Sequence, residues 1–386
     1  MKTLLIYIST IGIFLFSFAG DAAAQSGLSF SGYVKGVQTV SFEDIKDSII
    51  TSNLINNRLN FRWDVSEGMT SALEVRNRLF YGEQVKYTPG FGRFLDEDMG
   101  LVDLSANIVD ENNLVLNTSV DRLWINWAND DWDVRAGRQR INWGLNLTWN
   151  PNDIFNAYNF LDFDYEERPG SDAIRVQYYM GLFSNFDIAY KPGKGKDDDV
   201  GALRFFFNDW GYDFQFFGGI YLDDITAGTG WAGSISDAGF KGEFSYFHPY
   251  NGNEDESDEV SASLSVDYSF PNGIYLNGSI LFNSLGSNSF SGVQNFLDSE
   301  LSPKLLMPAK YSLLLQGSNS FSPIFNGSLS VIFSPVVNLA IIYPQFGYSI
   351  AEDWDLDFIA ELFWAEKNDS FQSIGNYIFT RLRWSF

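Results

Sequence analysis

The clearest pattern in this chain is the alternation of apolar and polar side chains along residues 374–386. Side chains of a β-strand point alternately to opposite faces, so every second residue shares a face. One face would hold Ile374, Ile378, Leu382, Trp384 and Phe386, and the other Tyr377, Arg381, Arg383 and Ser385. The first face suits hydrocarbon and the second suits water, which predicts a transmembrane strand.

Similar alternation recurs from residue 25 onward in about eighteen segments of the length that transmembrane strands need. Long or polar connections fall at 82–117, 140–171, 191–199, 249–259 and 284–307, and short ones at 129–131, 180–181, 208–209, 271–273 and 350–353. All the long connections lie on one side. The pattern therefore predicts an all-β fold, a single antiparallel transmembrane barrel with short periplasmic turns and long external loops. Sixteen strands remain open, because the boundaries near 222–240 and 318–340 are weak.

The amino terminus predicts export. A basic start at Lys2, an apolar stretch over residues 4–18 and small residues at 22–24 have the layout of a secretory signal peptide. We expect residues 1–24 to be the signal peptide and residues 25–386 to be the barrel. A membrane anchor is the alternative for the apolar stretch. Beyond residue 25 no window approaches the roughly 18 apolar residues of a spanning helix.

Composition narrows the class further. The chain is 17% aromatic and 19% charged, has no cysteine and carries a formal net charge of −24. The negative charge argues against nucleic acid as a partner. Without disulfides, an exported chain of this size needs its own hydrogen-bond network, which a closed barrel supplies. A soluble sandwich or propeller is the alternative, but its turns would not separate by length.

Strand parity places many basic residues on the water-facing side of the predicted barrel. These lumen candidates are Arg58, Arg62, Arg76, Arg78, Arg122, Arg135, Arg175, Arg381 and Arg383. A later strand turns Asp353, Asp355, Asp357 and Glu361 inward, so we expect opposed basic and acidic walls. Rows of arginine in a pore attract anionic groups. The alternative is that these charges only pair across strands and support a hydrated wall.

Aromatic residues allow two interpretations. Trp124, Tyr178 and Phe363 are candidates for a track in the lumen that stacks against sugars. Other aromatic residues near strand ends, such as Trp127, Trp132, Trp210, Tyr212, Trp354 and Trp384, are expected in the girdles at the membrane interfaces.

The richest stretch is Gly137-Arg138-Gln139-Arg140-Ile141-Asn142-Trp143-Gly144, followed by Asn150-Pro151-Asn152-Asp153 and by Arg168-Pro169-Gly170. It resembles porin-like outer-membrane proteins of the alginate-export and phosphate-selective types. The resemblance implies that loop 140–171, the third external loop, folds inward and narrows the pore. Arg138, Arg140, Asp153 and Arg168, with Glu166 and Glu167, would then lie at or near this constriction. The terminal Phe386 is similar to the signal that the barrel assembly machinery recognises.

These observations predict a passive outer-membrane channel for small hydrophilic solutes, with a preference for anions or acidic sugars. The alternative is a plugged structural or secretion-associated barrel whose external loops bind proteins or glycans. An enzyme is not expected, because His248 is the one histidine and lies in no evident catalytic group. We expect no cofactor, while a metal site stays open. Expected partners are outer-membrane lipid, lipopolysaccharide and the assembly machinery, and the protein could be a monomer or a homotrimer. Both termini would be periplasmic.

Overall fold

The computed structural model describes residues 27–43, 49–157, 170–195, 197–250, 257–289, 301–367 and 370–386. The predicted signal peptide, 1–24, and Arg168 lie outside the described residues. No helix among the residues described is both long and apolar enough to cross a membrane.

The described chain is almost entirely β-structure. The first strands are β1 (Leu28–Phe42), β2 (Ile50–Ser66), β3 (Met69–Gly82), β4 (Ser105–Glu111), β5 (Leu114–Ala128), β6 (Trp132–Gln139), β7 (Ser171–Tyr179), β8 (Ser184–Lys191) and β9 (Val200–Asp209). The others are β10 (Tyr212–Tyr221), β11 (Asp224–Ile235), β12 (Ala238–Pro249), β13 (Glu259–Ser269), β14 (Tyr275–Asn283), β15 (Tyr311–Ser322), β16 (Phe325–Ser334), β17 (Leu339–Ala351), β18 (Trp354–Lys367) and β19 (Ser370–Ser385). Two short helices, α2 (Glu83–Tyr87) and α3 (Phe91–Asp96), follow β3.

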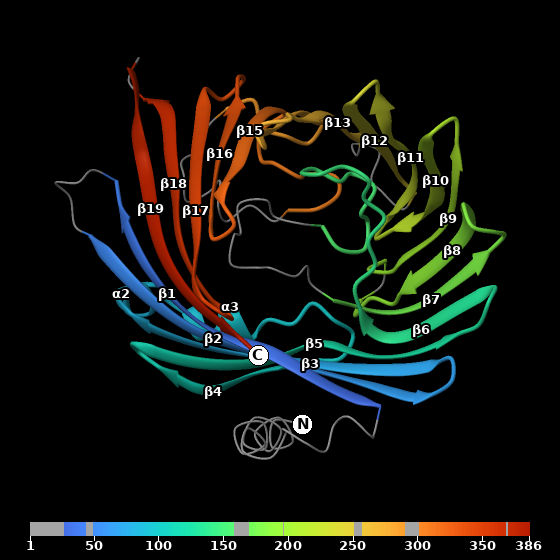
Figure 1. Cartoon of the computed structure of the whole chain (residues 1–386), viewed down its shortest axis with the longest axis horizontal. Coiled ribbons are helices and arrows are strands. Elements are labelled where there is room, and N and C mark those ends of the chain that lie inside the picture. Colours follow the sequence, from blue (N-terminus) through green and yellow to red (C-terminus); the bar gives the residue numbers. More distant parts are fainter. Residues whose placement is uncertain are drawn as a thin grey trace.

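Antiparallel pairing joins these strands into a closed ring (Figure 1). β19 pairs with both β18 and β1, which closes the barrel. Of the nineteen strands, β4 is additional, because β3 pairs directly with β5, so the ring holds eighteen. This confirms the all-β class and the larger of the two strand counts. Closure leaves no sheet edge, so the ladder hydrogen bonds of the ring are made within it.

The two rims of the barrel differ as the sequence predicted. Short turns such as Gly68, Gly211 and Asp353 lie at one rim, which we call the turn rim. The first described residues and the carboxy terminus meet there too, since Gly32 N donates to Phe386 O at 3.0 Å. The long connections lie at the opposite, loop rim. Some connections there are short: β10 and β11 are joined through Leu222 and Asp223, and β16 and β17 through residues 335–338, so length alone does not mark the loop rim.

Side chains alternate between the barrel interior and its outer face. On β8, Asp187 and Ala189 are buried while Phe186, Ile188 and Tyr190 are exposed on the outer face. Outward apolar side chains surround the barrel, among them Ile174, Leu203, Ile280, Leu315, Ile378 and Leu382. So much exposed apolar surface suits a lipid environment.

The parity predicted for β19 is wrong at Ile374. The register between β18 and β19 shifts between Phe363 and Trp364, which pair with Gly375 and Ser373 and leave Ile374 as an extra residue. Such a bulge changes the face to which a strand directs its side chains. Ile374 accordingly packs with the interior cluster around Phe363 instead of facing outward.

The connection between β3 and β5, residues 83–113, is called L2 here. The sequence suggested one long connection over 82–117, but this stretch contains α2, α3, β4 and the start of β5. β4 pairs with the loop-rim half of β5, while β6 pairs with the turn-rim half. L2 and β4 therefore continue the barrel wall above the point where β6 stops.

Candidate functional site

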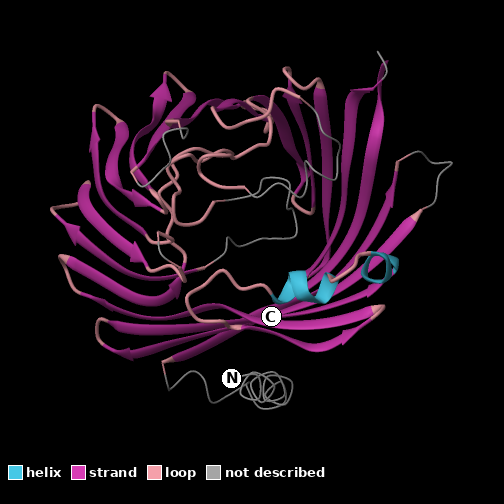
Figure 2. Cartoon of the chain, turned by 180° about the vertical axis from the view of Figure 1, so that it is seen from behind, coloured by secondary structure: helices cyan, strands magenta, loops and turns pink. Residues whose placement is uncertain are grey.

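The connection between β6 and β7, residues 140–170, is called L3, and its described part, 140–157, lies against the inner wall (Figures 1 and 2). Ile141, Trp143 and Asp153 have no exposed surface, and Trp149 is 1% exposed. A loop that buries such large apolar side chains must pack on another part of the protein. The interior of the barrel supplies that surface.

Trp143 fixes the first part of L3. Its indole Nε1 donates to Asp187 Oδ2 on β8 at 2.9 Å, and its carbonyl accepts from Gln215 Nε2 on β10 at 2.6 Å. The Arg204 guanidinium lies 5.4 Å from the centre of its ring system. Asp187 and Arg204 thus hold the indole, whose buried N–H needs an acceptor, and Gln215 holds the backbone of the same residue.

Glu243 on β12 fixes the middle of L3. Its carboxylate accepts hydrogen bonds from three backbone N–H groups: Leu145, Asn146 at 2.7 Å and Asn152 at 3.0 Å. Glu243 is 2% exposed. Bonds to a buried carboxylate are stronger than neutral ones, so this side chain holds the middle of L3 firmly to the wall.

Serines on β12 and β13 complete the attachment. Ser245 Oγ donates to Pro151 O at 2.9 Å, and Ser263 Oγ donates to Trp149 O at 2.9 Å. These small inward side chains leave room for the loop backbone to approach the wall.

The connection between β14 and β15, residues 284–310, is called L7, and its end also packs inside the barrel. Leu306 and Met307 are each 2% exposed, and they form one buried cluster with Trp149 of L3 and with inward residues of β14–β18 such as Phe363. L3 and L7 therefore meet over an apolar part of the inner wall. They restrict the interior at this level, on the side of β8–β18.

Lys304 ties L7 to two strand ends. Its ammonium pairs with Asp224 on β11 and with Glu259 on β13, the latter at 3.0 Å. Burial pulls the pKa of Lys304 down, but the hydrogen bonds to both carboxylates outweigh it and raise the pKa above its ordinary value. The lysine stays charged at neutral pH and holds L7 in place.

Arginines line the inner wall on the other side. Arg58 pairs with Glu74 and, at 2.9 Å, with Asp121, while Arg76 pairs with Asp121 at 3.1 Å. For these residues the alternative interpretation, pairing across strands, is confirmed. Arg122 lies on the same wall and donates to the backbone carbonyl of the preceding residue, Asp121, at 2.8 Å.

The other lumen candidates form a second set of contacts. Arg78 donates to Asn117 at 3.0 Å, and Arg381 pairs with Asp357 at 2.9 Å. Arg175 pairs with Asp187 at 2.6 Å, and Arg204 shares the same carboxylate at 3.1 Å. One carboxylate thus serves two guanidinium groups, which leaves this part of the wall electropositive.

Arg62 is exposed, and Arg135 and Arg383 are half-buried, whereas Arg58, Arg122, Arg204 and Arg381 are buried. Arg135 donates to the neutral Asn126 at 2.9 Å and lies 4.3 Å from the centre of the Trp124 ring system. Arg383 donates to Ser385 Oγ at 3.1 Å. The Arg62 side chain is 61% exposed and pairs with Asp64 at 3.5 Å. With the other inward arginines they form what we call the arginine arc, along β2, β3, β5, β6, β7, β9 and β19.

Two expectations about the lumen are wrong. The acidic residues of β18 do not face the basic wall from across the barrel, because Asp357 is the register partner of Arg381 on the adjacent strand. The aromatic track is not formed either. Phe363 is fully buried beneath L7, and Tyr178 lies 38% exposed against Trp132 at 4.7 Å between ring centres. Of these three aromatic candidates, Trp124 is the one that lies under an arginine of the arc, Arg135.

The structure also corrects the placement of Arg138. Its register partners are Leu123, 47% exposed on the outer face, and Asp172 on β7. Arg138 pairs with Asp98 of L2 and with Asp172, both at 2.7 Å, so it joins L2 to the outer side of the wall. Asp153 is buried in L3, where its carboxylate accepts from Trp143 N at 3.3 Å. Arg140 is exposed at the start of L3.

Replacing Arg138 with methionine is expected to destabilise the barrel by about 3–5 kcal/mol, because Asp98 and Asp172 would be left as buried charges without their partner. The readout is the rate of unfolding in urea, followed as loss of the compact band in gels of unheated samples. Arg62→Met is the matched control, since its exposed pair with Asp64 contributes about 0–1 kcal/mol. Equal unfolding rates for the two variants would contradict this assignment.

Sequence reasoning missed the residues that organise the interior. Asp121 and Asp187 are the shared acceptors of the arginines, and Gln215 and Glu243 hold L3. Asp187, Arg204, Gln215 and Glu243 were not among the residues that the sequence singled out, and nothing in the sequence indicated their partners. Asp121 lies at a bulge, where the register of β3 and β5 shifts, so simple alternation fails there.

His248 has a partner that the sequence did not suggest. Its Nδ1 lies 2.7 Å from Asp258 Oδ1, with both side chains 54% exposed, and Tyr246 donates to the same carboxylate at 2.6 Å. Hydrogen bonds from Tyr246 and His248 lower the pKa of Asp258. Among the described residues, no group of three or more histidine or acidic side chains is placed to hold a metal ion.

Solved structures that are similar to this chain over nearly its whole length include the three described next. The crystal structure of Acinetobacter baumannii OccAB1 has a TM-score of 0.58 at 10% identity, covering 95% of this chain and 99% of that one. OccAB4 of the same organism gives 0.57 at 9%, covering 95% and 100%. Pseudomonas aeruginosa OccK11 (OpdR) gives 0.57 at 10%, covering 93% and 96%. This chain has the fold of an outer-membrane porin.

The porin fold confirms the predicted type of barrel. No protein-family model matches the sequence, and no curated protein matches it. At 9–10% sequence identity, the similarity concerns the fold and not the identity of the residues in the lumen. What this porin-like barrel passes must therefore be argued from its own interior.

Proposed function

We propose that this protein is a passive outer-membrane channel for small hydrophilic solutes, with a preference for anions. The observation that supports this most is that the barrel interior contains both an attached loop, L3, and a wall lined by arginines. L3 is fixed to the wall by Glu243 and Trp143, and the arginine arc lines the wall along β2, β3, β5, β6, β7, β9 and β19. The loops narrow the interior on one side, and solutes would pass along the basic side.

The constriction would be formed by L3, with Arg140 at its start. Arg62, Arg135 and Arg383 would then guide a carboxylate or a similar anionic group by charge and by bidentate hydrogen bonds. Acidic sugars carry such carboxylates and fit this chemistry. In the outer membrane the loop rim would face outward and both termini the periplasm, as in barrels with short periplasmic turns. The chain could act as a monomer or a homotrimer.

A second candidate function is a plugged barrel whose external loops bind proteins or glycans. The packing of L3 and L7 together around Trp149 favours it, because two loops then occupy the interior at one level. The two functions differ in whether ions pass.

The test is reconstitution of the mature protein in planar bilayers, with single-channel conductance and the reversal potential measured in a KCl gradient. Steady conductance with a reversal potential on the chloride side supports the proposed channel, and block by an anionic sugar would support passage of acidic sugars. A folded, heat-modifiable protein that conducts no ions would overturn the channel and favour the plugged barrel.

A further inference from the structure

One buried carboxylate of the inner wall, that of Asp187 on β8, binds three side chains at once. Its Oδ2 accepts from Trp143 Nε1 at 2.9 Å, from Arg175 Nη2 at 2.6 Å and from Arg204 Nη2 at 3.1 Å. Its Oδ1 accepts from Arg175 Nε at 3.0 Å. Asp187 has no exposed surface, so it touches no solute and acts only through the groups that it binds.

The charges around Asp187 do not balance. Arg175 and Arg204 bring two positive charges to its one carboxylate. Arg135 on β6 is the register partner of Arg175, and the acceptor of its Nε is the neutral Asn126. Like charges that lie directly opposite each other on neighbouring strands repel. Three guanidinium groups therefore lie around a single shared carboxylate and make this level of the wall electropositive.

Asp133 on β6 offsets part of this excess. It is the register partner of Gln177, which is also the register partner of Asp187. Its Oδ2 accepts from Asn126 Nδ2 at 3.3 Å. The two carboxylates set against the three guanidinium groups leave one net positive charge at this level.

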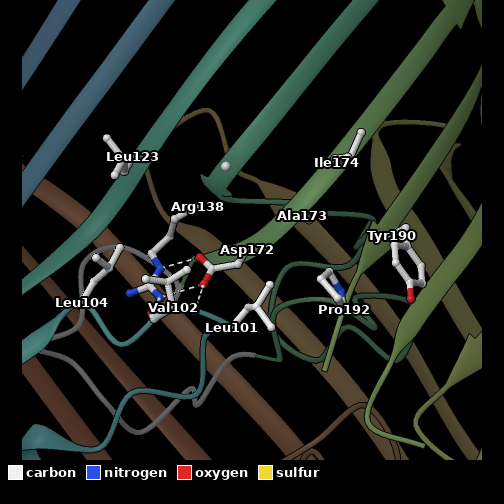
Figure 3. A pocket seen from close by; sticks show the side chains of 11 residues that line it. Leu101, Val102, Leu104, Leu123, Arg138, Asp172, Ala173, Ile174, Tyr190 and Pro192 are labelled. Atoms are coloured by element: carbon white, nitrogen blue, oxygen red, sulfur yellow. Dashed lines mark hydrogen bonds and ion pairs between the residues drawn. The ribbon is translucent and has the colours of Figure 1, made fainter. Parts of the chain in front are cut away.

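The outer face of the barrel shows the reverse ratio. There Arg138 serves two carboxylates, those of Asp98 and Asp172, both at 2.7 Å. Figure 3 shows Arg138 joined to Asp172 beside the outward side chains of Leu123 and Ile174. A guanidinium held by two carboxylates presents little charge to its surroundings, whereas two guanidinium groups that share one carboxylate keep part of theirs. The excess of arginine at Asp187 thus lies on the face along which a solute would pass.

Trp143 brings L3 to the level of Asp187. Its indole is bound to Asp187, and its ring system lies 5.4 Å from the Arg204 guanidinium. The side chains of Arg175 and Arg204 are 16% and 10% exposed. The field of their charge, more than broad contact, would therefore act on a solute that passes the attached loop.

We propose, on the basis of the channel function above, that Asp187 is a positioning residue that sets how strongly the pore holds anions. By binding Arg175 and Arg204 together, it offsets one of their two charges and fixes both groups beside L3. The remaining charge attracts a singly charged acidic sugar or a similar carboxylate. The buried carboxylate keeps that attraction weak enough for the solute to leave, and conduction requires both entry and escape.

Replacing Asp187 with asparagine is expected to raise the chloride preference about twofold or more at low salt. The reason is that one buried negative charge within about 10 Å of the path is removed. Glucuronate, a singly charged acidic sugar, should then block the pore for longer. The measurements are the reversal potential in a KCl gradient and the lifetime of glucuronate block events. High ionic strength should shrink the change in chloride preference.

Charge compensation separates this role from a purely structural one. The double variant Asp187→Asn, Arg204→Gln removes one charge of each sign and should return the chloride preference close to that of the wild type. Arg204→Gln alone should lower the preference about twofold, because Asp187 then balances Arg175 fully. A residue that only supported the fold would not give opposite shifts in these variants.

Folding of every variant is verified by heat modifiability on gels, because breaking a buried ion pair destabilises a protein. Arg204→Gln keeps Asp187 paired with Arg175, so it tests the proposal even where Asp187→Asn does not fold. Asp267→Asn is the matched control. It removes an inward carboxylate from β13, where Asp267 pairs with Lys241 at 2.9 Å away from the arginine arc.

Binding of glucuronate to the protein in detergent, measured by isothermal titration calorimetry, needs no open pore. We expect Asp187→Asn to bind it about twofold more tightly and Arg204→Gln to bind it more weakly. These shifts in a protein that conducts no ions would overturn the channel function and still support the role of Asp187. Unchanged chloride preference and unchanged binding in folded Asp187→Asn, or an equal shift in Asp267→Asn, would overturn the role of Asp187.

Discussion

Replacing Glu243 with alanine is expected to release L3 from the wall and raise the single-channel conductance. The carboxylate accepts from the backbone N–H groups of Leu145, Asn146 and Asn152. Losing these charge-assisted bonds costs about 3 kcal/mol or more. That free energy corresponds to a change of roughly a hundredfold in the equilibrium constant between the attached and the detached state of L3. The measurement is single-channel conductance in planar bilayers, with open-channel noise as a second readout of loop motion.

The conservative change Glu243→Gln separates charge from shape. Its amide oxygen can still accept from two of the N–H groups, but its NH₂ would face the third donor, so we expect a smaller rise in conductance. Asp267→Ala is the control, because Asp267 on β13 pairs with Lys241 on β12 at 2.9 Å and is not one of the residues that fix L3 to the wall. Unchanged conductance in Glu243→Ala would show that L3 is held by other contacts or does not limit the pore.

Neutralising Arg62, Arg135 and Arg383 together, each to glutamine, is expected to lower the chloride preference. In water, the Coulomb energy between one guanidinium charge and an anion 10 Å away is about 0.4 kcal/mol. That energy changes the occupancy of the pore by the anion by a factor of about two. The three changes together would lower anion occupancy about eightfold at low salt. The measurement is the reversal potential in a KCl gradient, repeated at high ionic strength, where the difference should shrink.

These three positions are better probes than the tightly paired arginines. Reversing Arg76 would place a carboxylate beside Asp121, which is 8% exposed, and folding itself would be at risk. Lys86→Gln in α2 serves as the control for a cation outside the arc. A triple variant with the selectivity of the wild type would exclude these residues from the ion path.

The local pattern of the sequence was sufficient for the barrel. Alternation with a period of two, long connections on one side and the absence of a spanning apolar helix each follow from the chemistry of strands in lipid. They gave the fold class, a count of about eighteen strands with sixteen still open, and outward faces, for example those of Ile378 and Leu382. Alternation failed at bulges, as at Ile374 and Asp121, because one extra residue reverses the face and leaves no compositional signal.

The sequence by itself determined that this chain forms a membrane barrel whose inward positions are rich in arginine. Tertiary structure alone decided which partners the arginines bind. Inside the barrel, Arg58 and Arg76 share Asp121, and Arg175 and Arg204 share Asp187. On the outer face, Arg138 fixes L2. Tertiary structure also decided that Glu243 holds L3, nearly a hundred residues earlier in the chain. Partners so distant in sequence meet only when the barrel closes, and a strand's pattern records which face a side chain takes but not what it meets there.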